Sequence, residues 1–198
     1  MKILVIDDKE VNQASAHQTL TGHDLTVVGT YAEGHELLGW NSNSSFDVVL
    51  SDLLMPASDR SMGKEGLKFV GEEMPVGFAL ALMAALRGVK YVAVVTATNH
   101  HDHPLSAMLD EFVSYLPQGG DFLREGVRPR FLVNGSRLGF YHAGLYHGTG
   151  HPEAVPSFIA VDGTVCLDCN GKGCHWGCGT TGKQHGKNWK AFFVHLIS

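Results

Sequence analysis

Three acidic residues and one threonine stand at the ends of apolar runs that are typical of buried strands. Asp7 and Asp8 follow the run ILVI, and Asp52 follows VVLS. Thr96 follows VAVV in the same way. Short β-branched runs of this kind indicate parallel strands that are buried on both faces. Ligands of open parallel sheets bind at the carboxyl ends of the strands, so we expect these four side chains to converge on one pocket.

The apolar pattern of the first part of the chain predicts the elements that would hold these residues in place. Strands are expected at residues 2–8, 24–31, 46–52 and 90–98. Helices are expected at residues 10–21, 32–40, 65–73, 77–87 and 103–116. This alternation of strands and helices predicts an α/β fold with a parallel sheet.

The second part of the chain has a different pattern. Two apolar arms flank Asn134-Gly135 within residues 130–143, which predicts a β-hairpin because Asn-Gly favours the tight turn. A segment rich in Gly and His follows, then an expected strand at 157–165 and a cysteine cluster. An amphipathic helix is expected at 188–197, where it would close the fold.

The bulk composition excludes some classes of function. The chain has 198 residues, of which 44% are hydrophobic, and it fits one domain. Its net charge of −5 gives no global basic field that would attract nucleic acid or a membrane surface. The most apolar stretch, residues 77–87, is too short to span a bilayer. The acidic pair comes too early for a signal peptide, so we expect a cytoplasmic protein with no membrane partner.

The order and spacing of these residues resemble the receiver domain of bacterial response regulators. The match consists of the acidic pair Asp7-Asp8, of Asp52 with LLMP behind it, and of Thr96. It covers residues 1–116 well and the last helix weakly. The resemblance implies a doubly wound, five-stranded parallel sheet and Mg²⁺ bound by the three acids. It also implies that a histidine kinase or phosphotransfer protein phosphorylates Asp52, and that Thr96 hydrogen-bonds the phosphoryl group.

The chemistry of the three acids agrees with this resemblance. A carboxylate nucleophile needs a hard cation to neutralise the incoming phosphoryl oxygens. Three clustered acids also do not all stay ionised without such a cation. The alternative for Asp52 is a degenerate pocket, or pseudo-receiver, kept for stability or partner binding. The alternative for Thr96 is an ordinary strand residue.

Three features depart from the receiver pattern. Receivers carry a lysine at the end of strand five, whereas the expected fifth strand here offers Asn134 or His142 in its place. A long segment between Asp52 and the apolar helix separates Asp52 from Thr96 more widely than usual. A second long segment separates the hairpin from the last helix. Both insertions are expected on the face that holds the acidic pocket.

All four cysteines lie close together, which favours a metal site over a disulfide framework. Their spacing resembles a zinc knuckle, with a cysteine in the position of the usual histidine, and four thiolates suit tetrahedral Zn²⁺. The predicted zinc ligands are Cys166, Cys169, Cys174 and Cys178. His175 or His185 is an alternative ligand, and free cysteines on a Gly-rich loop are the alternative to any metal.

Zinc knuckles often bind single-stranded nucleic acid by stacking bases on aromatic rings. Trp176 is the stacking candidate. The candidate phosphate contacts are Lys172, Lys183, Lys187 and Lys190. The alternative is a structural zinc that holds the long insertion together, and the acidic net charge favours it.

The histidines form a second polar group. His100, His101 and His103 surround Asp102 in the sequence NHHDH, after the fourth strand. Adjacent residues seldom all face one ion, so we favour a cap at the start of the next helix, made by Asp102 or His103, over a second metal site. The metal alternative would add further ligands from the insertion, at His142, His147 and His151.

Together these features predict one receiver-like domain over residues 1–198. A hairpin and a zinc-stapled, cysteine-rich subregion are expected as an insertion at 130–186, before the last helix. The predicted role is signal transduction with output by protein–protein contact. The alternative is a nucleic-acid or ribonucleoprotein-binding module that uses the receiver fold as a scaffold. A phosphatase of the haloacid dehalogenase type needs Asp-x-Asp on strand one, which DDKEV does not supply, so no classical enzyme activity is expected.

Overall fold

A computed structural model of the chain describes residues 1–43, 45–60, 63–97, 103–109, 113–114, 131–142, 158–160 and 185–197. Within these residues, a seven-stranded sheet has the order β2-β1-β3-β6-β9-β7, and β8 pairs with β9. Its strands are β1 (Lys2–Ile6), β2 (Asp24–Val28), β3 (Val48–Ser51), β6 (Tyr91–Thr96), β7 (Val113–Ser114), β8 (Phe131–Val133) and β9 (Ser136–His142).

The centre of this sheet is parallel. Strands β2, β1, β3, β6 and β9 pair side by side in parallel. The short strand β7 adds a parallel pairing beyond β9, and β8 pairs with β9 antiparallel. The predicted five-stranded parallel sheet is therefore confirmed, and the structure adds two short strands next to β9. All carboxyl ends of the parallel strands lie at one edge of the sheet, where a ligand site is expected.

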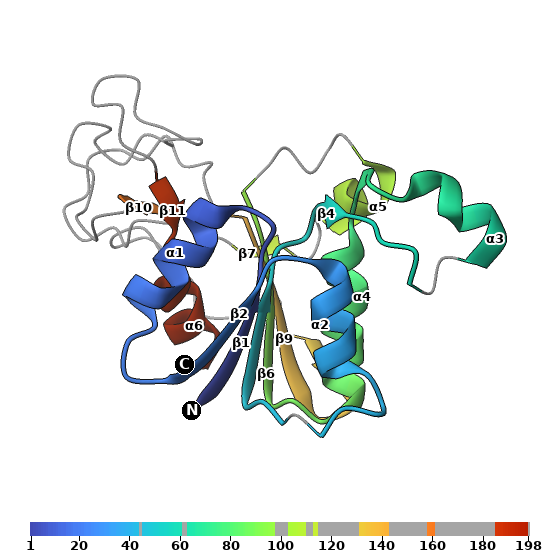
Figure 1. Cartoon of the computed structure of the whole chain (residues 1–198). Helices are drawn as coiled ribbons and strands as arrows, with labels where there is room; N and C mark the ends of the chain where they lie inside the picture. Colours follow the sequence, from blue (N-terminus) through green and yellow to red (C-terminus); the bar gives the residue numbers. More distant parts are fainter. Residues whose placement is uncertain are drawn as a thin grey trace.

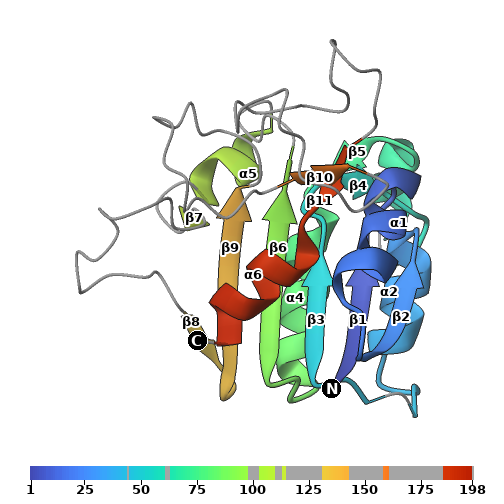
Figure 2. The same cartoon turned by 90° about the vertical axis from the view of Figure 1, so that its left-hand side faces the viewer.

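Helices cover both faces of the sheet. Helices α1 (Glu10–Thr19) and α6 (Trp189–Ile197) lie on one face, and α2 (Tyr31–Leu38) and α4 (Val76–Leu86) lie on the other, as Figures 1 and 2 show. The start of α2 illustrates how the sequence sets these bounds. The Thr30 hydroxyl accepts from the Glu33 backbone N–H at 3.2 Å, and the Glu33 carboxylate accepts from Thr30 Oγ1 at 2.7 Å. The Thr30 oxygen thus satisfies the Glu33 backbone N–H, which is one of the donors that the first helical turn leaves open.

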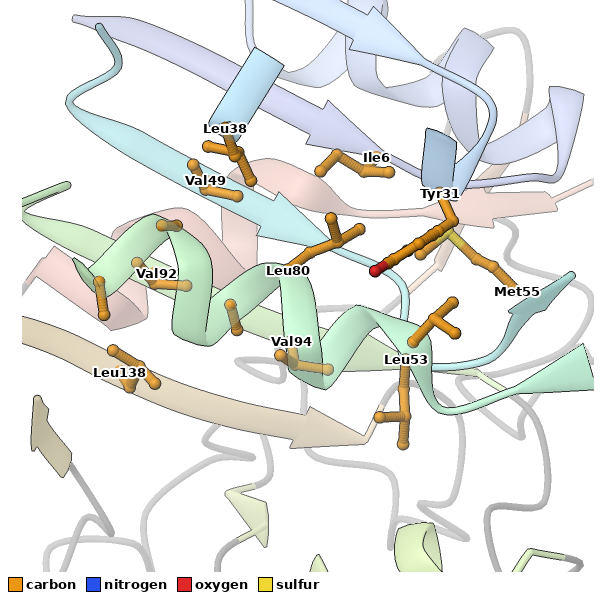
Figure 3. Packing of buried hydrophobic residues seen from close by; sticks show 14 of the residues in the cluster. Ile6, Tyr31, Leu38, Val49, Leu53, Met55, Leu80, Val92, Val94 and Leu138 are labelled. Atoms are coloured by element: carbon orange, nitrogen blue, oxygen red, sulfur yellow. The ribbon is translucent and has the colours of Figure 1, made fainter. Parts of the chain in front are cut away.

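Two hydrophobic cores follow from the alternation of side chains along the strands. On the side of α2 and α4, Leu80 packs against β1, β3 and β6, and Figure 3 shows it among Ile6, Val49 and Val94. On the opposite side, Trp189 of α6 is fully buried in the second core, among the strand residues that point the other way. Successive residues of one strand thus belong to different cores, which explains the continuous apolar runs in the sequence.

A segment that we call the arm, residues 55–74, leaves the body of the domain after β3. Its base is the antiparallel pair β4 (Met55–Pro56) and β5 (Glu73–Met74), and it contains the short helices α3 (Gly63–Gly66) and η1 (Leu67–Phe69). In Figure 1 the α3 end of the arm extends away from the sheet. The arm corresponds to the first predicted insertion, and its base lies close to the carboxyl end of β3.

The second part of the chain contains one confirmed prediction and one correction. The hairpin is formed by β8 and β9, and its turn residues Asn134 and Gly135 have φ values of 51° and 81°, as a tight Asn-Gly turn requires. The helix predicted at 103–116 is wrong in length: α5 spans only Pro104–Ala107, and Val113–Ser114 form β7 beside β9. Pairing with the sheet overrides the local helical pattern there.

A small separate sheet precedes the last helix. It consists of β10 (Phe158–Ala160) and β11 (His185–Lys187), paired antiparallel. β11 leads directly into α6, which closes the fold where the sequence predicted a helix. Among the described residues, none of the helices has the length and apolar character needed to cross a membrane.

Candidate functional site

Three carboxylates meet at the carboxyl edge of the sheet. Asp7 and Asp8 follow β1, Asp52 follows β3, and one oxygen of each lies within 4.8 Å of the others. The parallel register pairs Ile6 with Ser51, so the residues that follow these two leave the sheet side by side. The predicted convergence of the three acids is therefore confirmed. Asp7 and Asp52 are buried, and Asp8 is partly exposed.

A buried lysine from the far end of the chain lies against two of these carboxylates. Lys187 Nζ donates to Asp7 Oδ2 at 2.7 Å and to the Val95 carbonyl at 2.9 Å. It also lies 3.0 Å from Asp52 Oδ1, and its side chain is fully buried. Lys187 therefore places a buried ammonium group beside Asp7 and Asp52.

This contact corrects the expectation that Asn134 or His142 stands in for the lysine. Asn134 lies in the β8–β9 turn and donates to the Ala85 carbonyl at 3.1 Å, next to the end of α4. That turn precedes Arg137, which pairs with the first residue of β6, so Asn134 is at the edge of the sheet opposite the pocket. His142 pairs with Thr96 at the carboxyl edge of the sheet, and the ammonium group beside Asp52 comes from Lys187.

The prediction that Lys187 contacts nucleic-acid phosphates is wrong, because its side chain has no exposed surface. The sequence signal that could have found it is its place directly before the last helix, at the end of the short run HGK. The fifth parallel strand, β9, does not carry the lysine. Lys187 is on β11, which is far from β9 in the sequence and belongs to a different sheet.

The electrostatics of the pocket are dominated by burial and by the close charges. Burial raises the pKa of Asp52 to about 7, with Asp7 adding to the rise and Lys187 opposing it. For Lys187, burial acts to lower the pKa, but the attraction of Asp52 and Asp7 outweighs it, so the pKa is raised and the ammonium stays charged. The pocket thus holds one fully buried cation, Lys187, beside Asp7 and Asp52.

The backbone around Asp52 is tightly fixed. The Leu53 N–H donates to Asp52 Oδ1 at 2.7 Å, and the Asp52 N–H donates to the Ile6 carbonyl at 2.7 Å. Gly77, in the first turn of α4, packs so closely against Asp52 that a Cβ at Gly77 would overlap the Asp52 carbonyl oxygen. Because that atom belongs to the backbone, it cannot move aside cheaply. Asp52 therefore has a defined position directly after β3.

Two polar atoms of the pocket have no hydrogen-bond partner within the described part of the chain. They are Asp8 Oδ1 and the hydroxyl oxygen of Thr96, and both atoms are buried. Thr96 ends β6, the strand next to β3, and is 3% exposed. Buried polar atoms are nearly always paired in native proteins, so these two atoms are candidate contacts for a bound ligand or for water.

Lys9 links the pocket to the arm. Its ammonium group donates to Asp8 Oδ2 at 2.8 Å and lies 3.4 Å from Glu73 Oε1, at the base of the arm. The pKa of Lys9 is raised, mainly by its hydrogen bond to Asp8. Asp8 Oδ2 is thus paired with the partly exposed Lys9, whereas Asp8 Oδ1 has no partner among the described residues.

The remaining predicted site residues fall largely outside the described residues. These are Cys166, Cys169, Cys174, Cys178, Trp176 and most of the histidines. Of the NHHDH motif, His103 is described: its Nδ1 accepts from the Leu105 N–H at 3.2 Å, which confirms the predicted helix cap. His185, named as an alternative zinc ligand, is buried in β11.

The comparisons with known proteins agree with this geometry. A family model described as the response regulator receiver domain matches residues 3–116, which is more than half of the chain. No curated protein and no solved structure matches the chain. The matched residues include the three acids and Thr96, whereas the β8–β9 hairpin, Lys187 and α6 lie beyond them.

Proposed function

The chain belongs to the response-regulator receiver family, and we propose that it accepts a phosphoryl group on Asp52 with Mg²⁺ held by Asp7, Asp8 and Asp52. Its role as a receiver lies in signal transduction. We assign the phosphoryl donor to a histidine kinase or phosphotransfer protein, and the output to contact with another protein.

The observation that carries this proposal is the contact of Lys187 Nζ with Asp52 Oδ1 at 3.0 Å. Phosphoryl transfer depends on positioning and on positive charge close to the transferring oxygens. A fully buried ammonium group beside the acceptor carboxylate meets this need without any movement of the chain. A pocket kept only for stability would gain more from apolar residues in place of the whole group of Lys187, Asp7 and Asp52, since buried ion pairs are seldom better than well-packed apolar groups.

The acidic residues fit a hard divalent cation. Their oxygens come within 4.8 Å of one another, and the unpaired, buried Asp8 Oδ1 is an open ligand position. Carboxylate oxygens are the ligands that Mg²⁺ prefers, and it commonly binds through one or two of them while keeping several waters. When bound, the cation would supply positive charge against the phosphoryl oxygens.

The residues of the chain have distinct parts in the transfer. Asp52 Oδ1 is held by the Leu53 N–H and Lys187, so we assign Oδ2 as the nucleophile. Oδ2 forms a bond to phosphorus as the bond from phosphorus to the donor breaks, and the donor departs with the bonding electron pair. The product is an acyl phosphate, and Lys187 and the unpaired hydroxyl of Thr96 are the groups that can donate to its oxygens.

The direct test is incubation of the full chain with acetyl phosphate and Mg²⁺, followed by intact-mass measurement. We expect an increment of one phosphate in the wild type, and none in Asp52→Asn or after removal of Mg²⁺ by EDTA. Ser51→Ala is a matched control because it changes the neighbouring buried residue and leaves all three acids. A wild-type protein that gains no phosphate, or Asp52→Asn protein that gains one, would contradict the proposal.

We also propose that Cys166, Cys169, Cys174 and Cys178 bind one structural Zn²⁺. The support is their spacing in the sequence alone. Metal analysis should find one zinc per chain, and Cys169→Ser with Cys174→Ser should lose it. The nucleic-acid alternative is weaker than the sequence suggested, because Lys187, one of its four candidate phosphate contacts, is buried in the pocket.

A further inference from the structure

We propose that Asn12 is the positioning residue that fixes Lys187 beside the phosphoacceptor, by binding the Lys187 backbone and the Asp7 carboxylate with one side-chain amide. The inference rests on the proposed function, because it concerns the lysine of that site. It starts from an unusual feature of this chain: the lysine is on β11, which within the described residues pairs with β10 and not with a strand of the seven-stranded sheet. The hydrogen-bond ladder of the large sheet therefore does not set the position of Lys187.

The fully buried Asn12 side chain bridges the two halves of the pocket. Its Nδ2 donates to Asp7 Oδ1 and Oδ2, both at 3.0 Å, and its Oδ1 accepts from the Lys187 backbone N–H at 3.0 Å. The partners fix the orientation of the amide, since a carboxylate can only accept and a backbone N–H can only donate. No other side chain of this length offers a donor toward Asp7 and an acceptor toward Lys187.

The rest of α1 supports the same attachment. The Ser15 hydroxyl donates to the Lys187 carbonyl at 2.8 Å, and the Trp189 indole donates to the Asn12 carbonyl at 2.9 Å. A Cβ at Gly186 would come within 2.5 Å of the Val11 carbonyl oxygen, so the backbone of β11 lies directly on the backbone of α1. Gly186 and Trp189, on either side of Lys187 in the sequence, thus both contact the backbone of α1.

Removal of Asn12 would act on Lys187 in two ways. The Lys187 N–H would be left buried without its acceptor, which favours a shift of β11 toward water. Asp7 would lose both amide hydrogen bonds, so it would compete more strongly with Asp52 for the Lys187 ammonium group. Both effects move Nζ away from Asp52, although the Lys187 side chain itself is unchanged. Asn12 has no contact with the phosphoryl group in this scheme, and it acts only through Lys187 and Asp7.

A double-mutant cycle separates positioning from general damage to the fold. The measured quantity is the initial rate of phosphate incorporation from acetyl phosphate at saturating Mg²⁺. We expect Asn12→Ala to lower this rate on the order of tenfold in the wild type. In the Lys187→Ala background we expect no further decrease. Equal decreases in both backgrounds would overturn the proposal, because Asn12 would then act independently of the lysine.

Gln13→Ala is the matched control for this cycle. Gln13 is the next residue of α1, and its Nε2 donates to the Asp7 backbone carbonyl at 2.8 Å, not to the carboxylate or to Lys187. We expect it to leave the rate within about twofold of wild type. If Asn12→Ala fails to fold, Gly186→Ala and Ser15→Ala perturb the same attachment from β11 and from α1. They should give the same dependence on Lys187, and the absence of that dependence in both would overturn the proposal.

A second measurement does not depend on phosphorylation. In the full chain labelled with ¹⁵N-lysine, a buried ammonium group with three oxygen partners should exchange its protons slowly and give a resolved NH₃⁺ signal. Lys187→Met identifies this signal by its loss. We expect it to disappear or broaden in Asn12→Ala and to persist in Gln13→Ala; an unchanged signal in Asn12→Ala would overturn the proposal. If the wild type takes up no phosphate, the proposed function fails while this signal still decides the role of Asn12.

Discussion

Replacement of Lys187 by methionine should destabilise the metal-free protein strongly and Mg²⁺-bound protein much less. The lysine is fully buried, with its Nζ at 2.7 Å from Asp7 Oδ2 and 3.0 Å from Asp52 Oδ1. Methionine fills a similar volume but leaves two buried carboxylates without their counter-charge. Removal of one partner from a buried ion pair typically costs about 3–5 kcal/mol, and we expect a loss of this size in EDTA at pH 8.

The dependence on pH and metal makes this prediction specific. Without the lysine, the pKa of Asp52 rises further above its usual range, because Lys187 opposes the effect of burial. At pH 6 the carboxyl of the variant is therefore protonated, and the loss of stability should be smaller than at pH 8. Mg²⁺ replaces the missing positive charge, so it should stabilise the variant more than the wild type.

Urea unfolding with and without Mg²⁺, at pH 6 and pH 8, measures all of these differences. Lys190→Met is the matched control, because Lys190 lies three residues away on α6 and is exposed. That variant should stay within about 0.5 kcal/mol of wild type. The reasoning would be refuted if Lys187→Met had the unfolding free energy of wild type in EDTA at pH 8, or if Mg²⁺ stabilised both proteins equally.

Three further predictions concern neighbouring residues. Burial raises the pKa of Asp52 to about 7, so between pH values of about 4 and 7 the folded state binds more protons than the unfolded state. The free energy of unfolding of the metal-free wild type should therefore decrease as the pH rises through this range. Urea unfolding should show no such decrease for Asp52→Asn. Lys9→Met should strengthen Mg²⁺ binding about two- to fivefold by calorimetry, because Lys9 competes for Asp8, and unchanged or weaker binding would contradict this. Gly77→Ala should cost about 3 kcal/mol of stability, since its Cβ overlaps the Asp52 carbonyl; a neutral effect in urea unfolding would show that α4 can shift.

The first part of the fold was predictable because its strands are buried on both faces. The continuous apolar runs that end at Asp8, Asp52 and Thr96 each correspond to a strand of the parallel sheet. Parallel strands carry their ligand residues to one edge, so the meeting of the three acids followed from order and spacing alone. The hairpin was predictable for a local reason, namely the left-handed backbone of Asn134-Gly135.

The lysine of the pocket was not predictable by the same reasoning. The family resemblance implies a lysine at the end of the fifth strand, but in this chain a long insertion separates that strand from Lys187. What holds Lys187 in place is a set of contacts with α1, such as the hydrogen bond from its backbone N–H to Asn12. Contacts between residues so far apart in sequence leave no periodic signal.

The short length of α5 was not predictable either, for a similar reason: residues 113–114 pair with β9, which is distant in the sequence, and do not continue the helix.

The central claim is that Asp52 is the residue that accepts the phosphoryl group. Borohydride reduces an aspartyl phosphate to homoserine, which marks the phosphorylated position permanently. After treatment of the wild type with acetyl phosphate and Mg²⁺, then with borohydride, peptide mass spectrometry should find homoserine at position 52. Homoserine at Asp7, Asp8 or another aspartate, with position 52 unchanged, would contradict the account.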